Sequence, residues 1–425
     1  MVLRLEDEIS VMANKADKIL FICHDVLGRK ISGVGIRYLN LAQETACAGY
    51  QVTLTSPIME DNFQLKGIKL VSCKTAVNQE KEILQSDIVV ASILSLKLIK
   101  SALINHKILI FDLYDPIIFE QQERLKNTPL LTRKIKLAQI ASQLQLMLAS
   151  GDYFLCASHI QRDWWQMYLD KMGRGQNLIS VVPFGLQKNI KDNKQNIYHK
   201  IKGIGKNDKI ILWGGGIYDW LDPITPIKAM AEVIKQRKDA KLIFLSSTHP
   251  NPALPKMDMI EKAITFAEKL QLYNRFVYFL PGWIAYEERD NYFQNAYLGI
   301  CAHFDNLETK YAFRTRDLDY LKAELPIVTT KGDYFANLVE AEKIGLSVDF
   351  EKARAMATAI LKLLQDKKFY NSCQKNIVKI KSRFYWPNVA KPLLEFCRYP
   401  KRAQDKKRPF WLAAKYYFYK ILAKL

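Results

Sequence analysis

The segment Phe313–Thr330 carries the residues of this chain best suited to hold an anion. Its sequence, FRTRDLDYLKAELPIVTT, places two arginines at the start of a predicted helix, which a proline ends before a β-branched strand. Helix N-termini present free backbone N–H groups and a positive dipole, so anionic groups collect there. Arg314 and Arg316 add planar donors suited to phosphate oxygens, and Asp319 is placed to accept hydrogen bonds from sugar hydroxyls. We therefore predict a site for a diphosphate attached to a sugar.

Two glycine-rich stretches offer further places for a phosphate. Gly33 and Gly35 precede a predicted helix after the first strand, and Gly215 and Gly216 follow the strand that ends near residue 213. Because glycine has no side chain, a ligand can approach the backbone closely at these points. The first pair is equally compatible with a flexible turn, and we leave that alternative open.

Asp112, in the phrase FDLYDP, ends another predicted strand. A carboxylate there is placed to orient an acceptor hydroxyl or to take its proton. The alternative is that, of Asp112 and Asp115, one caps a turn before Pro116 and the other is merely solvated. The sequence contains no GxSxG, HExxH or Walker-type motif, which argues against serine hydrolases, zinc peptidases and P-loop ATPases. We expect no metal site and no cofactor.

The elements that must position these residues alternate between strand and helix. A chain of 425 residues is too long to fold around one hydrophobic core, so two domains are expected. Alternation of this kind predicts parallel sheets covered on both faces. We expect an α/β protein with two Rossmann-like domains facing across a cleft. The predicted segments are a first domain at 1–190, a linker at 191–207, a second domain at 208–383, a returning helix at 384–400 and a basic, aromatic helical tail at 401–425.

Three phrases carry a family resemblance: VVPFGL at 181–186, LDYLKAELPIVTT at 318–330 and FYWPNVAKPLLEF at 384–396. In order and spacing they resemble the GT-B glycosyltransferases of group 1, or family 4. The resemblance implies transfer of a sugar from a nucleoside diphosphate sugar to a saccharide or lipid-linked hydroxyl, with retention of configuration. A sugar-nucleotide epimerase of the same architecture is a minor alternative.

The chain also departs from the family pattern. Where the family usually has two glutamates eight positions apart, this chain has Tyr311 and Asp319, with Glu308 as a nearby substitute for the first. The family's basic pair after the second glycine loop is missing, so the two arginines are expected to offset the diphosphate charge. A catalytically inactive scaffold at the membrane is therefore the alternative. The resemblance implies catalytic roles for Asp112, Arg314 and Arg316, and donor contacts by Gly33, Gly35, Gly215, Gly216, Glu308, Tyr311 and Asp319.

The formal charge of +20 predicts an anionic partner. Residues 401–425 hold eight Lys or Arg against one acid, interspersed with aromatic residues. That composition suits an anionic membrane surface; the alternative is a helix packed on the first domain. Because no known nucleic-acid motif is present, we do not expect nucleic-acid binding. The N-terminal residues do not resemble a secretory signal, so the expected location is cytoplasmic, peripheral on the inner face of the plasma membrane.

Overall fold

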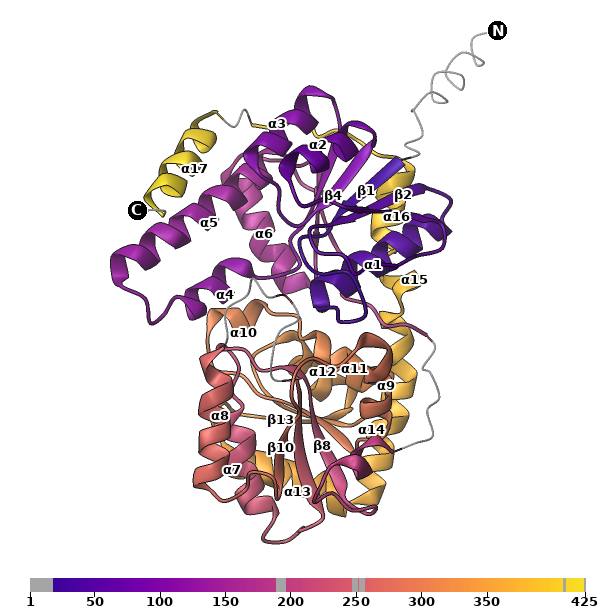
Figure 1. The fold of residues 1–425 in the computed structure, drawn as a ribbon, viewed down its shortest axis with the longest axis vertical. Coiled ribbons are helices and arrows are strands. Elements are labelled where there is room, and N and C mark those ends of the chain that lie inside the picture. Colours follow the sequence, from indigo (N-terminus) through magenta and orange to yellow (C-terminus); the bar gives the residue numbers. More distant parts are fainter. Residues whose placement is uncertain (1–17, 189–195, 247–250, 252–256, 408–409, 424–425) are drawn as a thin grey trace.

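The computed structural model describes residues 18–188, 196–246, 251, 257–407 and 410–423. Two α/β domains lie one above the other along the long axis of the molecule (Figure 1). Each contains a parallel sheet with helices on both faces. The predicted fold class is therefore confirmed.

The first domain contains a seven-stranded parallel sheet in the order β3-β2-β1-β4-β5-β6-β7. Its central strands, with the sequences IVVA and ILIFD, are buried along their whole length, as apolar runs in covered parallel sheets are. The strands are β1 Lys18–Ile22, β2 Gln51–Ser56, β3 Ile68–Ser72, β4 Ile88–Ala91, β5 Ile108–Asp112, β6 Tyr153–Cys156 and β7 Ile179–Val181. The helices are α1 Gly33–Cys47, α2 Ala76–Leu84, α3 Leu96–Ile104, α4 Ile117–Arg124, α5 Leu130–Ser150 and α6 His159–Lys171.

The second domain contains a six-stranded parallel sheet in the order β10-β9-β8-β11-β12-β13. The order turns back at β8 in this sheet and at β1 in the first, so each has a switch point where ligands bind in such folds. The strands are β8 Lys209–Gly216, β9 Ala240–Ser246, β10 Val277–Phe279, β11 Leu298–Cys301, β12 Ile327–Thr330 and β13 Gly345–Val348. The helices are α7 Ile224–Val233, α8 Asp258–Lys269, α9 Tyr286–Gln294, α10 Leu307–Tyr311, α11 Thr315–Lys322, α12 Tyr334–Glu342, α13 Ala353–Gln365 and α14 Lys367–Ile380.

The chain crosses between the domains in two adjacent segments. Leu186 N donates to the Phe384 carbonyl over 2.6 Å, and Trp386 N donates to the Leu186 carbonyl over 3.1 Å. Beyond this crossing, α15 (Trp386–Val389) contacts α1, and α16 (Lys391–Arg398) contacts β7. The last helices therefore return to the first domain. The final helix, α17 (Phe410–Leu422), also lies against the first domain, beside α5 (Figure 1).

Two details differ from the sequence expectation. The helix that carries the two arginines begins at Thr315, so Arg314 is its N-cap residue, with extended backbone. Its side chain is held outside the helix by Glu308, as described below. The segment between the two sheets contains a short 3-10 helix at Ile197–Lys200, which the side chain of Tyr198 anchors in the core.

Candidate functional site

A cavity of about 290 Å³ lies between the two domains, lined by residues of both. From the first domain come Gly33, at the start of α1, and the crossing segment Phe184–Gln187. From the second come the glycines that end β8, the loop after β10, and α11. Both switch points thus open onto one space. Within the described helices, none is long and apolar enough to cross a bilayer.

The glycine run Gly214–Gly216 forms a floor without side chains. A Cβ at Gly214 would lie 2.6 Å from the Phe293 ring, so this position excludes larger residues. Gly215 has φ of +102°, a conformation that L side chains rarely adopt, and nothing lies within 4 Å of where its Cβ would be. Gly215 and Gly216 line the cavity. Of the first pair, Gly33 lines it, whereas Gly35 packs against the Val26 carbonyl, 2.6 Å from a Cβ built there.

Arg316 lies at the edge of this floor. Its Nη2 donates to the Gly216 carbonyl over 2.9 Å, and its guanidinium lies 4.7 Å above the centre of the Trp213 ring. The residue is 8% exposed and lines the cavity. Its Nη1 is buried and finds no hydrogen-bond acceptor among the described residues. A buried donor on a cation that lacks an acceptor lowers the stability of the fold. Binding of an anionic oxygen to this nitrogen would remove that penalty.

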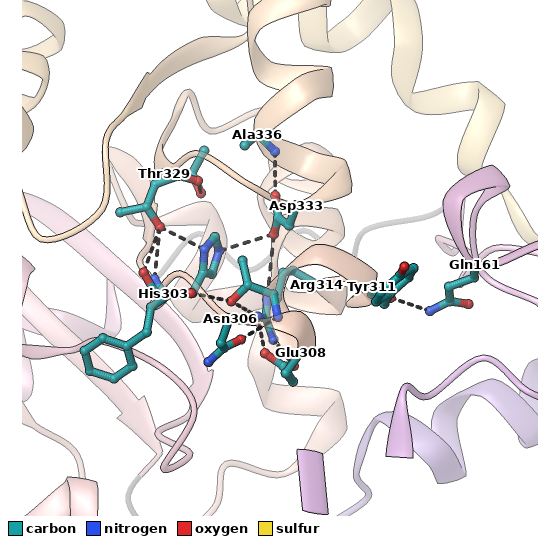
Figure 2. A network of polar contacts seen from close by, with 12 residues as sticks. Gln161, His303, Asn306, Glu308, Tyr311, Arg314, Thr329, Asp333 and Ala336 are labelled. Carbon is teal, nitrogen blue, oxygen red and sulfur yellow. Dashed lines mark hydrogen bonds and ion pairs between the residues drawn. The ribbon is translucent and has the colours of Figure 1, made fainter. Parts of the chain in front are cut away.

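Arg314, two residues earlier, has a different environment. Its Nη1 and Nη2 donate to the two carboxylate oxygens of Glu308, each over 2.7 Å, and its Nε lies 3.7 Å from Asp333 Oδ2 (Figure 2). Burial opposes its charge, but the Glu308 carboxylate outweighs that effect and raises the pKa of Arg314. Neither Arg314 nor Glu308 lines the cavity. The pair therefore fixes the chain where α11 begins, while Arg314 Nε finds no hydrogen-bond acceptor among the described residues.

A histidine that the sequence did not single out completes this network. His303 Nε2 lies 3.2 Å from Asp333 Oδ2 (Figure 2). Its Nδ1 lies 2.8 Å from the Thr330 hydroxyl. Burial lowers the pKa of His303, which favours the neutral form of the ring. Asp333 also caps α12 by accepting from Ala336 N over 2.7 Å. The sequence feature that could have indicated His303 is its position, two residues after β11 at the carboxyl edge of the sheet.

Asp319 lies one turn further along α11 and lines the cavity. Its carboxylate accepts a hydrogen bond from Arg289 of α9. Burial raises its pKa, and Arg289 opposes that shift. On the same rim Lys322 pairs with Asp290 over 2.7 Å. Sequence reasoning missed these three partners, because nothing in the order of residues indicates that α9 faces α11.

Asp112 is engaged within the first domain. Its two oxygens accept from Arg37 Nε and Nη2 over 2.7 and 2.8 Å, and both side chains are fully buried. Arg37 also donates to the Pro183 carbonyl over 2.9 Å. Asp112 is not among the residues that line the cavity. Its neighbour Asp115 has a pKa raised to about 7, chiefly by burial.

Tyr311 bridges the two domains instead of lining the cavity. Its ring stacks on Phe119, at 5.2 Å and 15°, and lies 5.1 Å from Trp164, both in the first domain. Its backbone carbonyl accepts from Gln161 Nε2 over 2.6 Å (Figure 2). At this position the family that the chain resembles has a glutamate, whereas this chain has an aromatic contact between the domains.

The described residues contain no group of three or more His, Cys, Asp or Glu arranged to hold a metal ion. The elements of the site are a glycine floor, an anion-ready arginine and a helix N-terminus at the carboxyl ends of two facing parallel sheets. This arrangement defines the GT-B class of folds.

Comparison with known proteins agrees with that class. Residues 208–366 match the family model "Glycosyl transferases group 1". The solved structure of WaaG, described as a glycosyltransferase involved in lipopolysaccharide biosynthesis, superimposes with a TM-score of 0.67 at 14% identity, covering 89% of this chain and 99% of that one. Alr3699/HepE of Anabaena, solved in complex with UDP-glucose, has a TM-score of 0.65 at 16% identity over 89% of this chain and 98% of its own.

A curated relative, sucrose-phosphate synthase 4 of Arabidopsis thaliana, is 38% identical over 77 residues, which are 17% of this chain and 7% of that protein. The match to the group 1 model lies within the second domain, and the solved structures share the two-domain fold.

Proposed function

We propose that this chain transfers a sugar from a nucleoside diphosphate sugar to a saccharide or lipid-linked hydroxyl, with retention, in the synthesis of a surface polysaccharide or glycolipid. The observation that carries the proposal is Arg316, a buried cation whose Nη1 has no acceptor among the described residues and which lines a glycine-floored cavity. The fold shared with a protein of lipopolysaccharide biosynthesis and with a UDP-glucose complex supports it.

The donor diphosphate would lie over Gly215 and Gly216, with its charge met by Arg316 and by the first amides of α11. Negative charge grows on the diphosphate as the bond to the sugar breaks. Donors that are fixed in advance stabilise that state more than the ground state. Asp319 would accept from a ribose hydroxyl after Arg289 moves aside. The first domain, which lines the cavity at Gly33, would limit the access of water to the reacting carbon.

The test is nucleotide binding, measured by calorimetry and thermal shift with UDP, GDP and ADP and their sugars. We expect one nucleotide to bind the wild-type chain, and Arg316→Met to weaken that binding roughly 10- to 100-fold, the loss typical of a hydrogen bond to a charged group. Arg354→Met, an exposed arginine on α13, is the matched control. If no nucleotide or nucleotide sugar binds the folded chain, the proposal is wrong.

A second candidate, a catalytically inactive GT-B scaffold, is favoured by one observation. The position of the family's first glutamate holds Tyr311, and the nearby Glu308 is engaged with Arg314. Nucleotide binding without measurable transfer or donor hydrolysis, over a broad panel of acceptors, would support this scaffold. Turnover that Arg316→Met abolishes, with folding intact, would exclude it.

A further inference from the structure

Helices α5 and α17 lie side by side at one flank of the first domain (Figure 1). Residues 403–407 contact that domain at several points. Ala403 N donates to Asp152 over 2.9 Å, Lys406 Nζ binds the same carboxylate over 2.7 Å, and Arg174 pairs with Asp405 over 3.0 Å. Lys407 N donates to the Ala149 carbonyl at the end of α5. These contacts hold residues 403–407 against the first domain, and α17 itself packs on α5.

One face of α17 is buried against α5, and the opposite face is apolar and exposed. Ala413 and Tyr416 are 8% and 5% exposed and pack into the core of the first domain. Phe418 and Ile421 are 58% and 62% exposed. With Trp411 and Ala414 they recur at intervals of three, four and three residues, which places them on one side of a helix. The neighbouring Tyr417 is also exposed.

The other end of α5 presents the same chemistry. Leu130 and Leu131 begin the helix and are 56% and 71% exposed. Arg133, Lys134 and Lys136 follow within the next five residues. We call the exposed side chains of residues 130–136 and of α17 the α5–α17 surface.

The charge on the α5–α17 surface has one sign. Helix α5 contains three Lys or Arg, helix α17 contains two, and neither contains an Asp or Glu. A second copy of this chain would bring the same cations face to face, which disfavours a symmetric pairing. Exposed aromatic and aliphatic side chains with lysines beside them match a bilayer interface, where rings lie at headgroup depth and lysines reach lipid phosphates.

We propose that the α5–α17 surface docks this protein on an anionic phospholipid bilayer, with Trp411, Phe418 and Ile421 entering the interface. Helix α4, which precedes α5, contacts α10 of the second domain, so the surface continues toward the place where the domains meet. Docking would therefore hold that edge of the cleft close to the lipid. A lipid-linked acceptor follows from this position, and that consequence alone rests on the proposed function.

The experiment is vesicle co-sedimentation of the full chain with phosphatidylcholine alone and with phosphatidylcholine containing phosphatidylglycerol. We expect binding to the anionic vesicles, weakened by added salt. The triple variant Trp411→Ser, Phe418→Ser, Ile421→Ser should lose most of it. Leu270→Ser with Val378→Ser, two exposed apolar residues of the second domain, is the control and should bind like wild type.

The charges are tested separately. Arg133→Gln, Lys134→Gln and Lys136→Gln together should lower partition more than tenfold, since each basic residue near an anionic surface contributes roughly a fivefold gain. Lys368→Gln, Lys375→Gln and Lys379→Gln on α14 form the matched control. Equal binding by wild type and both surface variants would overturn the proposal. So would a wild-type dimer that the Ser variant dissociates without any change in vesicle binding.

Nucleotide affinity is measured on the same preparations. It depends on the interdomain cavity and not on the α5–α17 surface, so loss of docking and loss of donor binding are seen separately. A surface variant that loses vesicle binding must retain the wild-type unfolding temperature and nucleotide affinity. A variant that loses all three has unfolded, and the charge variants then decide the question.

Discussion

At the scale of single residues, Arg314 and Arg316 show how neighbours of identical type take different tasks. Arg314 gives both terminal nitrogens to Glu308, while Arg316 keeps Nη1 without an acceptor among the described residues. Sequence reasoning had treated them alike, because both precede or begin a helix. What separates them is the buried carboxylate six residues before Arg314, which binds both terminal nitrogens of the first arginine, whereas the second lines the cavity.

The buried pair of Arg37 and Asp112 gives a prediction about the role of Asp112. Asp112→Asn keeps the shape of the side chain but leaves the Arg37 guanidinium buried without a counter-charge. We expect the free energy of unfolding to fall by about 3–5 kcal/mol, as when one partner of a buried ion pair is removed. Denaturant unfolding measures this loss. Replacing both partners, Arg37→Met with Asp112→Leu, should restore much of the stability.

A different outcome would support the catalytic interpretation of Asp112. If Asp112→Asn unfolds like wild type and yet loses turnover, the carboxylate acts on substrate and the pair with Arg37 is secondary. The sequence could indicate that Asp112 ends a strand at the carboxyl edge of the sheet. It could not indicate that Arg37, 75 residues away on α1, would donate hydrogen bonds to both carboxylate oxygens.

At the scale of elements, the sequence was most informative in segments where a single pattern of apolar residues dominates. Apolar runs such as IVVA predicted buried parallel strands, and the Pro after α11 predicted its end. The lining of the cavity was predictable where the backbone forms it, at Gly215, Gly216 and the start of α11. It was not predictable where two elements meet only in the fold, as α9 meets α11 through Arg289 and Asp319. No local pattern encodes that contact.

The contact between α10 and α4 carries a prediction for Tyr311. Its ring packs on Phe119 and Trp164 of the other domain, and each such aromatic pair contributes about 0.5–1.5 kcal/mol. Tyr311→Ala should therefore favour a more open arrangement of the domains. Small-angle scattering should show a larger radius of gyration than for wild type, while Tyr311→Phe, which keeps the ring, should match wild type. Identical scattering from all three proteins would show that these rings do not hold the domains together.

At the scale of the whole molecule, the two crossing segments set how the domains face each other. Gly185 lies between Phe184 and Leu186, and all three line the cavity. The backbone at Leu186 is bonded on one side to Phe384 and on the other to Trp386. A change at this crossing therefore acts on domain orientation and on the donor cavity together.

The final prediction follows from the space at Gly185. A Cβ added there would lie 2.4 Å from Trp386 Cδ2, against a rigid ring that also packs on Phe184 at 5.2 Å. Because the ring cannot move without shifting the crossing backbone, Gly185→Ala should cost about 1–3 kcal/mol of stability, as overpacking does, and should weaken nucleotide binding. Denaturant unfolding and calorimetry measure the two effects. Gly205→Ala is the control, since its Cβ would meet nothing closer than 3.7 Å. A Gly185→Ala protein that unfolds and binds like the control would mean that the crossing tolerates displacement and that the cavity does not depend on it.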